Sequence, residues 1–260
     1  MPKEPKLSFE HVSKAYPSRR GEARRLAVED VTLNIEEGHF VCLLGPSGCG
    51  KSTLLNMAAG FILPTSGRIL VDAKEIAGPG IDRGVVFQEY ALFPWYTALQ
   101  NVELGPRAKG MPAAARRALA ERYLAMVGLT DHIHKYPREL SGGMKQRAAI
   151  ARTLANEPRI MLMDEPFGAL DAQTREGLQD QLLDIWSATR TTIVFVTHSI
   201  NEAVLLSDEV AILAAHPGRL IHTVRNRLPR PRSRTSADVV ELEREIYDQR
   251  YLAESRRAAE

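Results

Sequence analysis

The feature that most constrains the fold is a glycine-rich segment between an apolar run and a helical pattern. Residues 45–52 read Gly-Pro-Ser-Gly-Cys-Gly-Lys-Ser, directly after Phe40–Leu44 and at the start of a helical pattern over Lys51–Ala59. Glycines let backbone N–H groups turn inward around an anion, because any Cβ would crowd so tight a turn. A helix that begins there directs its positive dipole end at the same point. The pattern therefore predicts a strand, a phosphate-binding loop (P-loop) and a helix, in that order.

The side chains of this loop predict how a nucleoside triphosphate and a magnesium ion are held. Lys51 places a positive charge on the outer phosphates, and Ser52 offers its hydroxyl to magnesium. The alternative is a chance glycine-rich turn, which the flanking strand and helix patterns disfavour. The residues that we expect to contact the nucleotide here are Gly45, Pro46, Ser47, Gly48, Cys49, Gly50, Lys51, Ser52 and Thr53.

Short apolar runs without polar alternation recur along the chain, as in strands that are buried on both faces of a parallel sheet. They are Phe40–Leu44, Val85–Phe87, Ile160–Met163, Thr192–Val196 and Val210–Leu213. Helical patterns alternate with these runs, so the sequence predicts an α/β fold with a parallel sheet. The helical patterns cover Lys51–Ala59, Ala113–Val127, Gly142–Asn156, Asp171–Ala188 and Ile200–Leu206.

Other stretches predict the domain organisation. Leu7–Tyr16 and Val31–Ile35 alternate apolar and polar residues, as strands with one exposed face do. No good strand lies between Phe87 and Ile160, so we expect a helical insertion over about residues 89–158. A Pro/Arg-rich linker follows Val224, and a final helical pattern spans roughly Ala237–Ala253, with Val239, Leu242 and Ile246 on one stripe. We therefore expect one domain over residues 7–230 and a linker with a helix over residues 231–260.

Charge and cysteine usage narrow the class of protein. The net charge of +2 argues against a general nucleic-acid binder. Arginines gather near both ends, which favours a solvated, flexible surface over contact with lipid headgroups or a partner. The two cysteines, Cys42 and Cys49, make no disulfide framework and fit a reducing compartment. The arginines are Arg19, Arg20, Arg24 and Arg25 in the first cluster, and Arg225, Arg227, Arg230, Arg232 and Arg234 in the second.

The expected location follows from a search of the sequence for targeting and membrane-spanning segments. The first residues, Met-Pro-Lys-Glu-Pro-Lys, form no apolar signal peptide, and no run approaches the roughly 18 apolar residues that cross a bilayer. We therefore expect a cytosolic protein whose membrane association comes through another chain.

Polar side chains stand where several of the predicted strands end. Asp164 and Glu165 follow Ile160–Met163, Gln88 follows Val85–Phe87, and His198 comes after Thr197 at the end of another run. Ligands of open α/β sheets bind at the carboxyl ends of the strands, where the P-loop also lies. Asp164 fits the orientation of magnesium, and Glu165 fits a general base or water positioner. His198 fits a sensor of the terminal phosphate rather than a structural histidine, and Gln88 fits a ligand of magnesium or of the attacking water.

A second motif carries a family resemblance. Residues 140–147, Leu-Ser-Gly-Gly-Met-Lys-Gln-Arg, resemble the ABC signature motif, and their place between the P-loop and Asp164-Glu165 is that of an ABC ATPase. The resemblance covers Leu7 to about Pro231, and Met144 departs from the commoner Gln. It implies ATP and Mg²⁺ as cofactors, with Tyr16 stacked on adenine. It also makes Gln88 the Q-loop residue, Ala169–Asp171 the D-loop and His198 the switch histidine.

The signature has a physical reading of its own. Ser141 is a good helix N-cap, and Gly142 and Gly143 leave N–H groups open at a helix N-terminus, which makes a second anion site. The resemblance implies that these three residues touch the γ-phosphate held by another copy of the chain. Two copies would then enclose two ATP molecules. The implied fold is a P-loop NTPase (RecA-like) core with a parallel sheet, an N-terminal antiparallel β subdomain and an inserted α-helical subdomain.

Finer resemblance favours one branch of the family. Ile76–Gln88, Phe93-Pro94-Trp95 and the tail Leu228–Arg232 look like the nitrate/sulfonate/taurine importer branch. That branch implies two membrane permease subunits, an indirect link to a solute-binding protein, and a peripheral place on the cytoplasmic face of the inner membrane. Trp95 and Tyr96 would line the groove for a permease helix; the alternative places Trp95 in the helical core.

Two other kinds of ABC protein compete with an importer subunit. One is the ATPase of a separate-subunit exporter, and the other is a soluble ABC protein that acts on ribosomes or DNA. The second kind usually has two P-loops or a long coiled-coil insertion, and this sequence shows neither. The solute stays open among nitrate, sulfonates, taurine, bicarbonate and pyrimidine precursors, because this subunit does not touch it.

Overall fold

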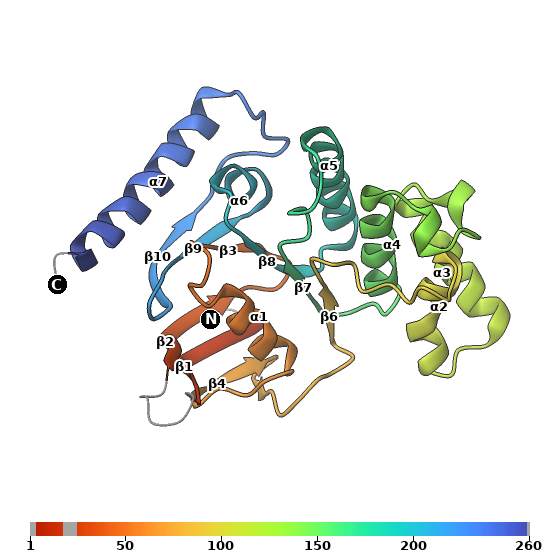
Figure 1. The fold of residues 1–260 in the computed structure, drawn as a ribbon, viewed down its shortest axis with the longest axis horizontal. Helices are drawn as coiled ribbons and strands as arrows, with labels where there is room; N and C mark the ends of the chain where they lie inside the picture. Colours follow the sequence, from red (N-terminus) through yellow and green to blue (C-terminus); the bar gives the residue numbers. More distant parts are fainter. Residues whose placement is uncertain (1–3, 18–24, 259–260) are drawn as a thin grey trace. The chain divides into compact units, whose positions relative to one another are not determined.

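A computed structural model describes residues 4–17 and 25–258, with residues 252–258 described by their backbone alone (Figure 1). The chain divides into two compact units. Unit 1 lies within Met1–Gly80 and Thr192–Glu260, and unit 2 is Ile81–Thr191. Among the described residues, no helix is both long and apolar enough to cross a membrane.

Unit 1 begins with an antiparallel sheet of order β2-β1-β4-β5. Its strands are β1 (Leu7–Tyr16), β2 (Arg25–Ile35), β4 (Ser66–Val71) and β5 (Lys74–Glu75). Along β2, Val31, Leu33 and Ile35 are buried and alternate with exposed residues, because successive side chains of a strand point to opposite faces. This sheet confirms the predicted N-terminal antiparallel β subdomain.

The other strands of unit 1 form a mostly parallel layer of order β10-β9-β3-β8. They are β3 (Phe40–Leu44), β8 (Thr192–Thr197), β9 (Glu209–Ala214) and β10 (Arg219–Arg225). Every residue of β3 is buried, since strands lie on both of its sides and its apolar side chains fill both faces. Leu44 stands opposite Thr197 of β8 and Ile212 of β9, so the segments that follow β3 and β8 begin side by side.

The helices in the described part of unit 1 are α1 (Lys51–Ala59), α6 (Ile200–Leu206) and α7 (Ala237–Ala258). Helix α7 contacts α6, β9 and β10, and Figure 1 shows it running beside β10 and α6. Val239 and Ile246 are buried, as the predicted apolar stripe requires. Cys42 in β3 and Cys49 are both buried free thiols, and burial raises the pKa of each.

Unit 2 pairs β6 (Arg83–Val86) with β7 (Ile160–Asp164) in parallel. Only helices and turns lie between these two strands, so the predicted helical insertion is confirmed. The longer helices are α2 (Ala98–Ala108), α3 (Ala113–Met126), α4 (Gly142–Leu154) and α5 (Ala172–Thr189), and short 3₁₀ helices cover Thr130–His132 and Pro137–Glu139.

The sequence patterns missed α2, β4, β5 and β10. Helix α2 contains Gly105 and Pro106, which disfavour a helix interior, but a capping box between Thr97 and Gln100 secures its first turn. Strand β10 lies at the edge of its sheet and carries exposed polar side chains, which leaves it without the apolar run of a buried strand. Strand β2 also begins earlier than the predicted Val31, because its first residues pair with the end of β1.

Two arginines of the Pro/Arg-rich linker are not the solvated surface that the composition predicts. Arg230 forms an ion pair with Asp208, and both Arg230 and Arg232 are half-buried. Arg232 donates hydrogen bonds to carbonyls at and just after the end of α6, where a cation interacts favourably with the helix dipole. Burial lowers the pKa of Arg232 to about 10. At this end of α6, Arg232 binds the carbonyls of Val204, Leu205 and Ser207, at 2.8, 3.2 and 2.7 Å. Arg232 also donates to the Leu228 carbonyl at 3.0 and 3.1 Å.

Arg25 and Arg227 are exposed, as predicted for the arginine clusters. Arg19, Arg20 and Arg24 lie outside the described residues. Arg230 and Arg232 of the second cluster thus supply part of the packing of unit 1.

We predict that Arg232→Ala destabilises the protein by about 1–3 kcal/mol, or roughly 3–8 °C in melting temperature, because several buried carbonyls lose a charged donor. Arg227→Ala is the matched control, since it removes the same charge from an exposed position. Thermal unfolding followed by circular dichroism measures both variants. Equal melting temperatures for the two variants would contradict the role of Arg232.

Candidate functional site

Close packing dictates the glycines of the P-loop. A Cβ at Gly45 would lie 2.6 Å from Cys49 Sγ and 2.6 Å from the Leu213 carbonyl oxygen. Gly50, the N-cap of α1, has φ of 87° in the left-handed region, and a Cβ there would approach the Val28 side chain to 2.6 Å. Larger residues would therefore force the loop open, and the sequence-predicted turn needs glycine at both positions.

Lys51 lies against the inside of this loop. Its side chain is buried, and its Nζ donates hydrogen bonds to the carbonyl oxygens of Gly45 at 2.8 Å and Pro46 at 3.0 Å. These contacts hold a positive charge beside the first turn of α1, where the open N–H groups also favour an anion. The Ser52 side chain is exposed on that turn and Thr53 is half-buried. Ser47 and Gly48 form the exposed tip of the loop.

A hollow of about 330 Å³ adjoins the P-loop within unit 1. Tyr16 and Gly48 both line it, so the structure brings the predicted adenine-stacking residue to the predicted phosphate loop. Tyr16 is 38% exposed, which leaves ring surface available to a ligand.

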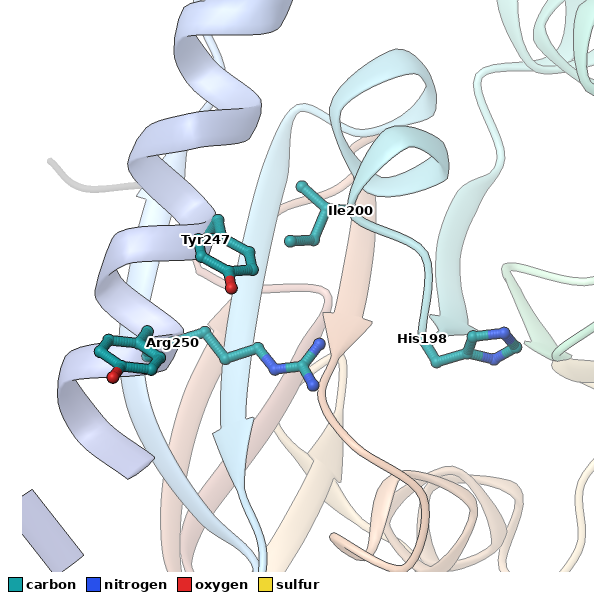
Figure 2. Close-up of a pocket in the computed structure, with 5 residues that line it drawn as sticks. His198, Ile200, Tyr247 and Arg250 are labelled. Carbon is teal, nitrogen blue, oxygen red and sulfur yellow. The ribbon is translucent and has the colours of Figure 1, made fainter. Parts of the chain in front are cut away.

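His198 follows β8 directly, on the loop that enters α6 (Figure 2). Because Thr197 of β8 stands opposite Leu44 of β3, this histidine and the P-loop leave neighbouring strand ends on one edge of the sheet. The His198 side chain is exposed, and Ser199 caps α6 through its hydroxyl. His198 also lines a surface hollow with Ile200 and with residues Tyr247, Arg250 and Tyr251 of α7.

The strand ends of unit 2 carry the other polar residues. Asp164 ends β7, and Glu165 follows with φ of 41°, a left-handed conformation that is strained for a residue with a side chain. Strain of this kind clusters at functional sites. A Cβ placed on Gly168 would lie 3.3 Å from Gln88 Nε2 and 3.8 Å from Glu165 Oε2, so both side chains approach Gly168.

The signature residues form the N-terminus of α4. Ser141 is the N-cap, and its hydroxyl accepts a hydrogen bond from the Met144 N–H at 3.3 Å. Gly143 is buried against α5, since a Cβ there would lie 2.6 Å from Thr174 Cγ2. Asp171 caps α5 by accepting from the Thr174 N–H at 3.0 Å, and this bond lowers the pKa of Asp171. The N-terminus that carries Ser141 is thus fixed by packing while Ser141 itself stays exposed.

An aromatic cluster stands on the loop before α2. Trp95 is 65% exposed, so the alternative that it belongs to the helical core is wrong. The centroid of the Trp95 ring lies 5.5 Å from the Phe93 ring centroid and 6.3 Å from the Tyr96 ring centroid. Asn101, which is fully buried, binds both the N–H and the carbonyl of Phe93 and the carbonyl of Tyr96. This amide holds the aromatic loop in place.

Comparison with known proteins assigns the family. The ABC transporter family profile matches residues 28–168. The chain belongs to the ABC transporter family. It is 50% identical to an uncharacterized ABC transporter ATP-binding protein of Methanocaldococcus jannaschii, over 93% of this chain and 90% of that protein.

Two relatives from Synechocystis are named by the transport they serve. A bicarbonate transport ATP-binding protein is 49% identical over 89% of this chain and 83% of its own length. A nitrate import ATP-binding protein is 46% identical over 88% of this chain and 87% of its own length. This chain therefore resembles the ATP-binding subunits of the nitrate importer branch.

A solved structure gives the same assignment. The dimeric post-hydrolysis state of an ATP-binding cassette bound to ADP and Pi matches with a TM-score of 0.75 and 36% identity, covering 86% of this chain and 100% of that one. The chain is thus an ABC ATPase, and the P-loop NTPase fold predicted from its sequence is confirmed.

One residue of this ABC ATPase was missed by the sequence patterns. Arg152 of α4 donates hydrogen bonds to the carbonyls of Tyr90 at 3.2 Å and Ala91 at 2.5 Å. Both of these residues have left-handed backbones, with φ of 61° and 49°. A Cβ on Gly142 would lie 3.1 Å from Tyr90 Oη, so the same loop also touches the signature. Arg152 therefore ties the loop after Gln88 to the signature helix, and only the fold reveals this, because its partners are backbone atoms.

We predict that Arg152→Lys loosens residues 88–92, because Arg152 reaches the two carbonyls through two separate guanidinium nitrogens and lysine offers one nitrogen in their place. Amide hydrogen exchange in that loop should quicken by about tenfold, which corresponds to roughly 1.4 kcal/mol of lost local stability. Lys145→Gln on the same helix is the control and should leave the loop unchanged. Unaltered exchange in Arg152→Lys would show that the loop holds its shape without this contact.

Proposed function

We propose that this ABC ATPase powers the import of a small solute through separate membrane subunits. The observation that carries the proposal is its similarity to bicarbonate and nitrate transport ATP-binding proteins along nearly the whole of each chain. The exposed Phe93-Pro94-Trp95 segment, which resembles that importer branch, supports it further. We place the ATPase domain over residues 7–230, with the linker and helix of 231–260 as an accessory segment.

In this proposal the chain binds ATP by its P-loop. Lys51, the N–H groups of Gly45 and of residues 47–50, and the first turn of α1, which includes Thr53, hold the phosphates. Tyr16 stacks on the base. Ser52, Gln88 and Asp164 would hold Mg²⁺, and their hydroxyl, amide and carboxylate oxygens are the donors that this ion prefers. When bound, Mg²⁺ neutralises charge on the phosphates.

Hydrolysis then needs a water molecule placed in line with the γ-phosphorus. Glu165 accepts a proton from that water as the new P–O bond forms and the bond to ADP breaks, releasing ADP and phosphate. Gln88, whose side chain approaches Gly168 as that of Glu165 does, orients the water. His198 donates a hydrogen bond to the γ-phosphate, and Lys51 stabilises the charge that develops.

The signature residues serve a second copy of the chain. Ser141, Gly142 and Gly143 present a helix N-terminus to the γ-phosphate that the partner subunit binds. The dimeric state of the related cassette with ADP and Pi supports this arrangement. Two chains would close over two ATP molecules, and hydrolysis would let them part.

Coupling to transport is assigned to the aromatic loop. Trp95 is exposed and packs beside the half-buried Phe93 and Tyr96, which makes an apolar surface of the kind that receives a partner helix. Arg152 connects the segment that follows Gln88 to the signature helix. Movement at Gln88 would thus reach two membrane permease subunits, which receive solute from a solute-binding protein. The ATPase then lies on the cytoplasmic face of the inner membrane, attached through those subunits.

We predict that Glu165→Gln lowers ATP turnover by roughly 10²–10⁴-fold, because the amide cannot accept the proton of the attacking water. ATP binding should persist, so size-exclusion chromatography with Mg-ATP should show a stable dimer. Lys51→Ala serves as the comparison, and it should lose both nucleotide affinity and the dimer. Wild-type turnover in Glu165→Gln would refute the assignment of the base.

We predict that Trp95→Ala uncouples transport. In proteoliposomes with the permease and the solute-binding protein, solute uptake should fall at least about tenfold, as for an interface anchor, while ATP hydrolysis by the isolated subunit is unchanged. Ile81→Ala, another exposed apolar residue of unit 2, is the control. Transport in the export direction would contradict the proposed import function. Solute uptake that is as fast in Trp95→Ala as in the wild type would contradict the coupling role of Trp95.

A further inference from the structure

The turn between β9 and β10 enters the hollow that adjoins the P-loop. His216 and Pro217 of this turn line it together with Tyr16 and Gly48. The remaining lining comes from the start of β2, at Arg25, Leu26 and Ala27. No sequence motif pointed to this turn, because its residues lie far along the chain from both Tyr16 and the P-loop.

The turn is held by hydrogen bonds to β2 and by packing against the P-loop. The Gly218 N–H donates to the Ala27 carbonyl at 2.9 Å, and the Glu29 N–H donates to the Gly218 carbonyl at 2.8 Å. The next residue, Arg219, donates from Nε to Glu29 at 2.8 Å. A Cβ on Gly218 would lie only 2.1 Å from the Cys49 carbonyl oxygen, so the turn is packed directly against the P-loop. His216 and Pro217 are therefore held in a fixed place relative to Gly48.

The chemistry of the lining suits one end of a nucleotide. The P-loop takes the phosphates, which leaves the nucleoside to the part of the hollow beside Tyr16. A planar imidazole ring can stack on an aromatic base, and the C–H groups of a proline ring offer an apolar surface that packs against it. His216 has φ of 59°, a left-handed backbone that the surrounding contacts must maintain.

We propose that His216 and Pro217 form a second contact surface for the purine nucleoside, in addition to Tyr16, and that His216 is a positioning residue for ATP. This inference rests on the proposed ATP-binding function of the same site. According to this inference, the β9–β10 turn contributes to ATP affinity through contacts with the base and ribose, and it makes no contact with the phosphates.

The test replaces the ring and keeps the backbone. His216→Asn removes the imidazole, and Asn tolerates the left-handed conformation better than other residues do. Isothermal titration of the full chain measures the Kd for ATP and, separately, for inorganic tripolyphosphate. His222→Asn is the control, since this histidine is exposed on β10 and does not line the hollow.

We expect His216→Asn to weaken ATP binding roughly three- to tenfold while tripolyphosphate binding stays within about twofold, because only the ring contact is lost. The KM for ATP should rise with kcat preserved, and His222→Asn should match the wild type. Unchanged ATP affinity would overturn the inference, and so would an equal loss for tripolyphosphate. Lys51→Ala, made without the His216 change, distinguishes failure of this inference from failure of the proposed function. If Lys51→Ala binds ATP as tightly as the wild type, the proposed ATP-binding function itself has failed.

Discussion

The parallel, in-register pairing of buried strands is the constraint on which the rest of the structure depends. Leu44 stands opposite Thr197 in unit 1, and Val86 stands opposite Met163 in unit 2. Strands β3 and β8 are buried on both faces, so a slip of one residue would bring side chains of the wrong size into a close-packed interior, and packing fixes the register. The register in turn fixes which residues emerge together at the strand ends. The P-loop and His198 emerge in one unit, and Gln88 emerges with Asp164 in the other.

The proposed function assigns different tasks of an ATPase to the two units. Unit 1 supplies the loop that holds phosphates, the hollow beside Tyr16 and the turn at His216. Unit 2 supplies Glu165, the signature and the exposed aromatic loop. The strained backbone of Glu165 and the two left-handed residues held by Arg152 all lie in unit 2. Conformations of this kind persist only where the surroundings enforce them, so Glu165 and the loop held by Arg152 are under backbone constraint.

Motifs whose chemistry is local could be predicted from the sequence. The P-loop glycines, the helix cap Ser141 and the carboxylates at the end of β7 can be recognised from residue type and from the strand or helix pattern beside them. The strands of the parallel layer were equally visible, because burial on both faces leaves only apolar residues. Strand β10 and helix α2 were not, since an edge strand keeps polar residues and a capping box can override a proline.

The roles of residues whose partners are backbone atoms could not be predicted from the sequence. Arg232 reads as one more linker arginine until the end of α6 is seen beside it, and Arg152 reads as an ordinary helix arginine. His216 gives no signal because its neighbours Tyr16 and Gly48 are distant in sequence. Each of these roles depends on which main-chain atoms the fold brings near, and side-chain patterns do not encode that directly.

The measurement that tests the account most directly is an experimental structure of Glu165→Gln with Mg-ATP. We predict one γ-phosphate within direct or water-bridged hydrogen-bonding reach of Lys51, Gln88, His198 and residue 165, with Ser141 of the partner subunit closing the site. A nucleotide bound away from the P-loop, or a γ-phosphate that these strand-end residues do not approach, would contradict the central claim.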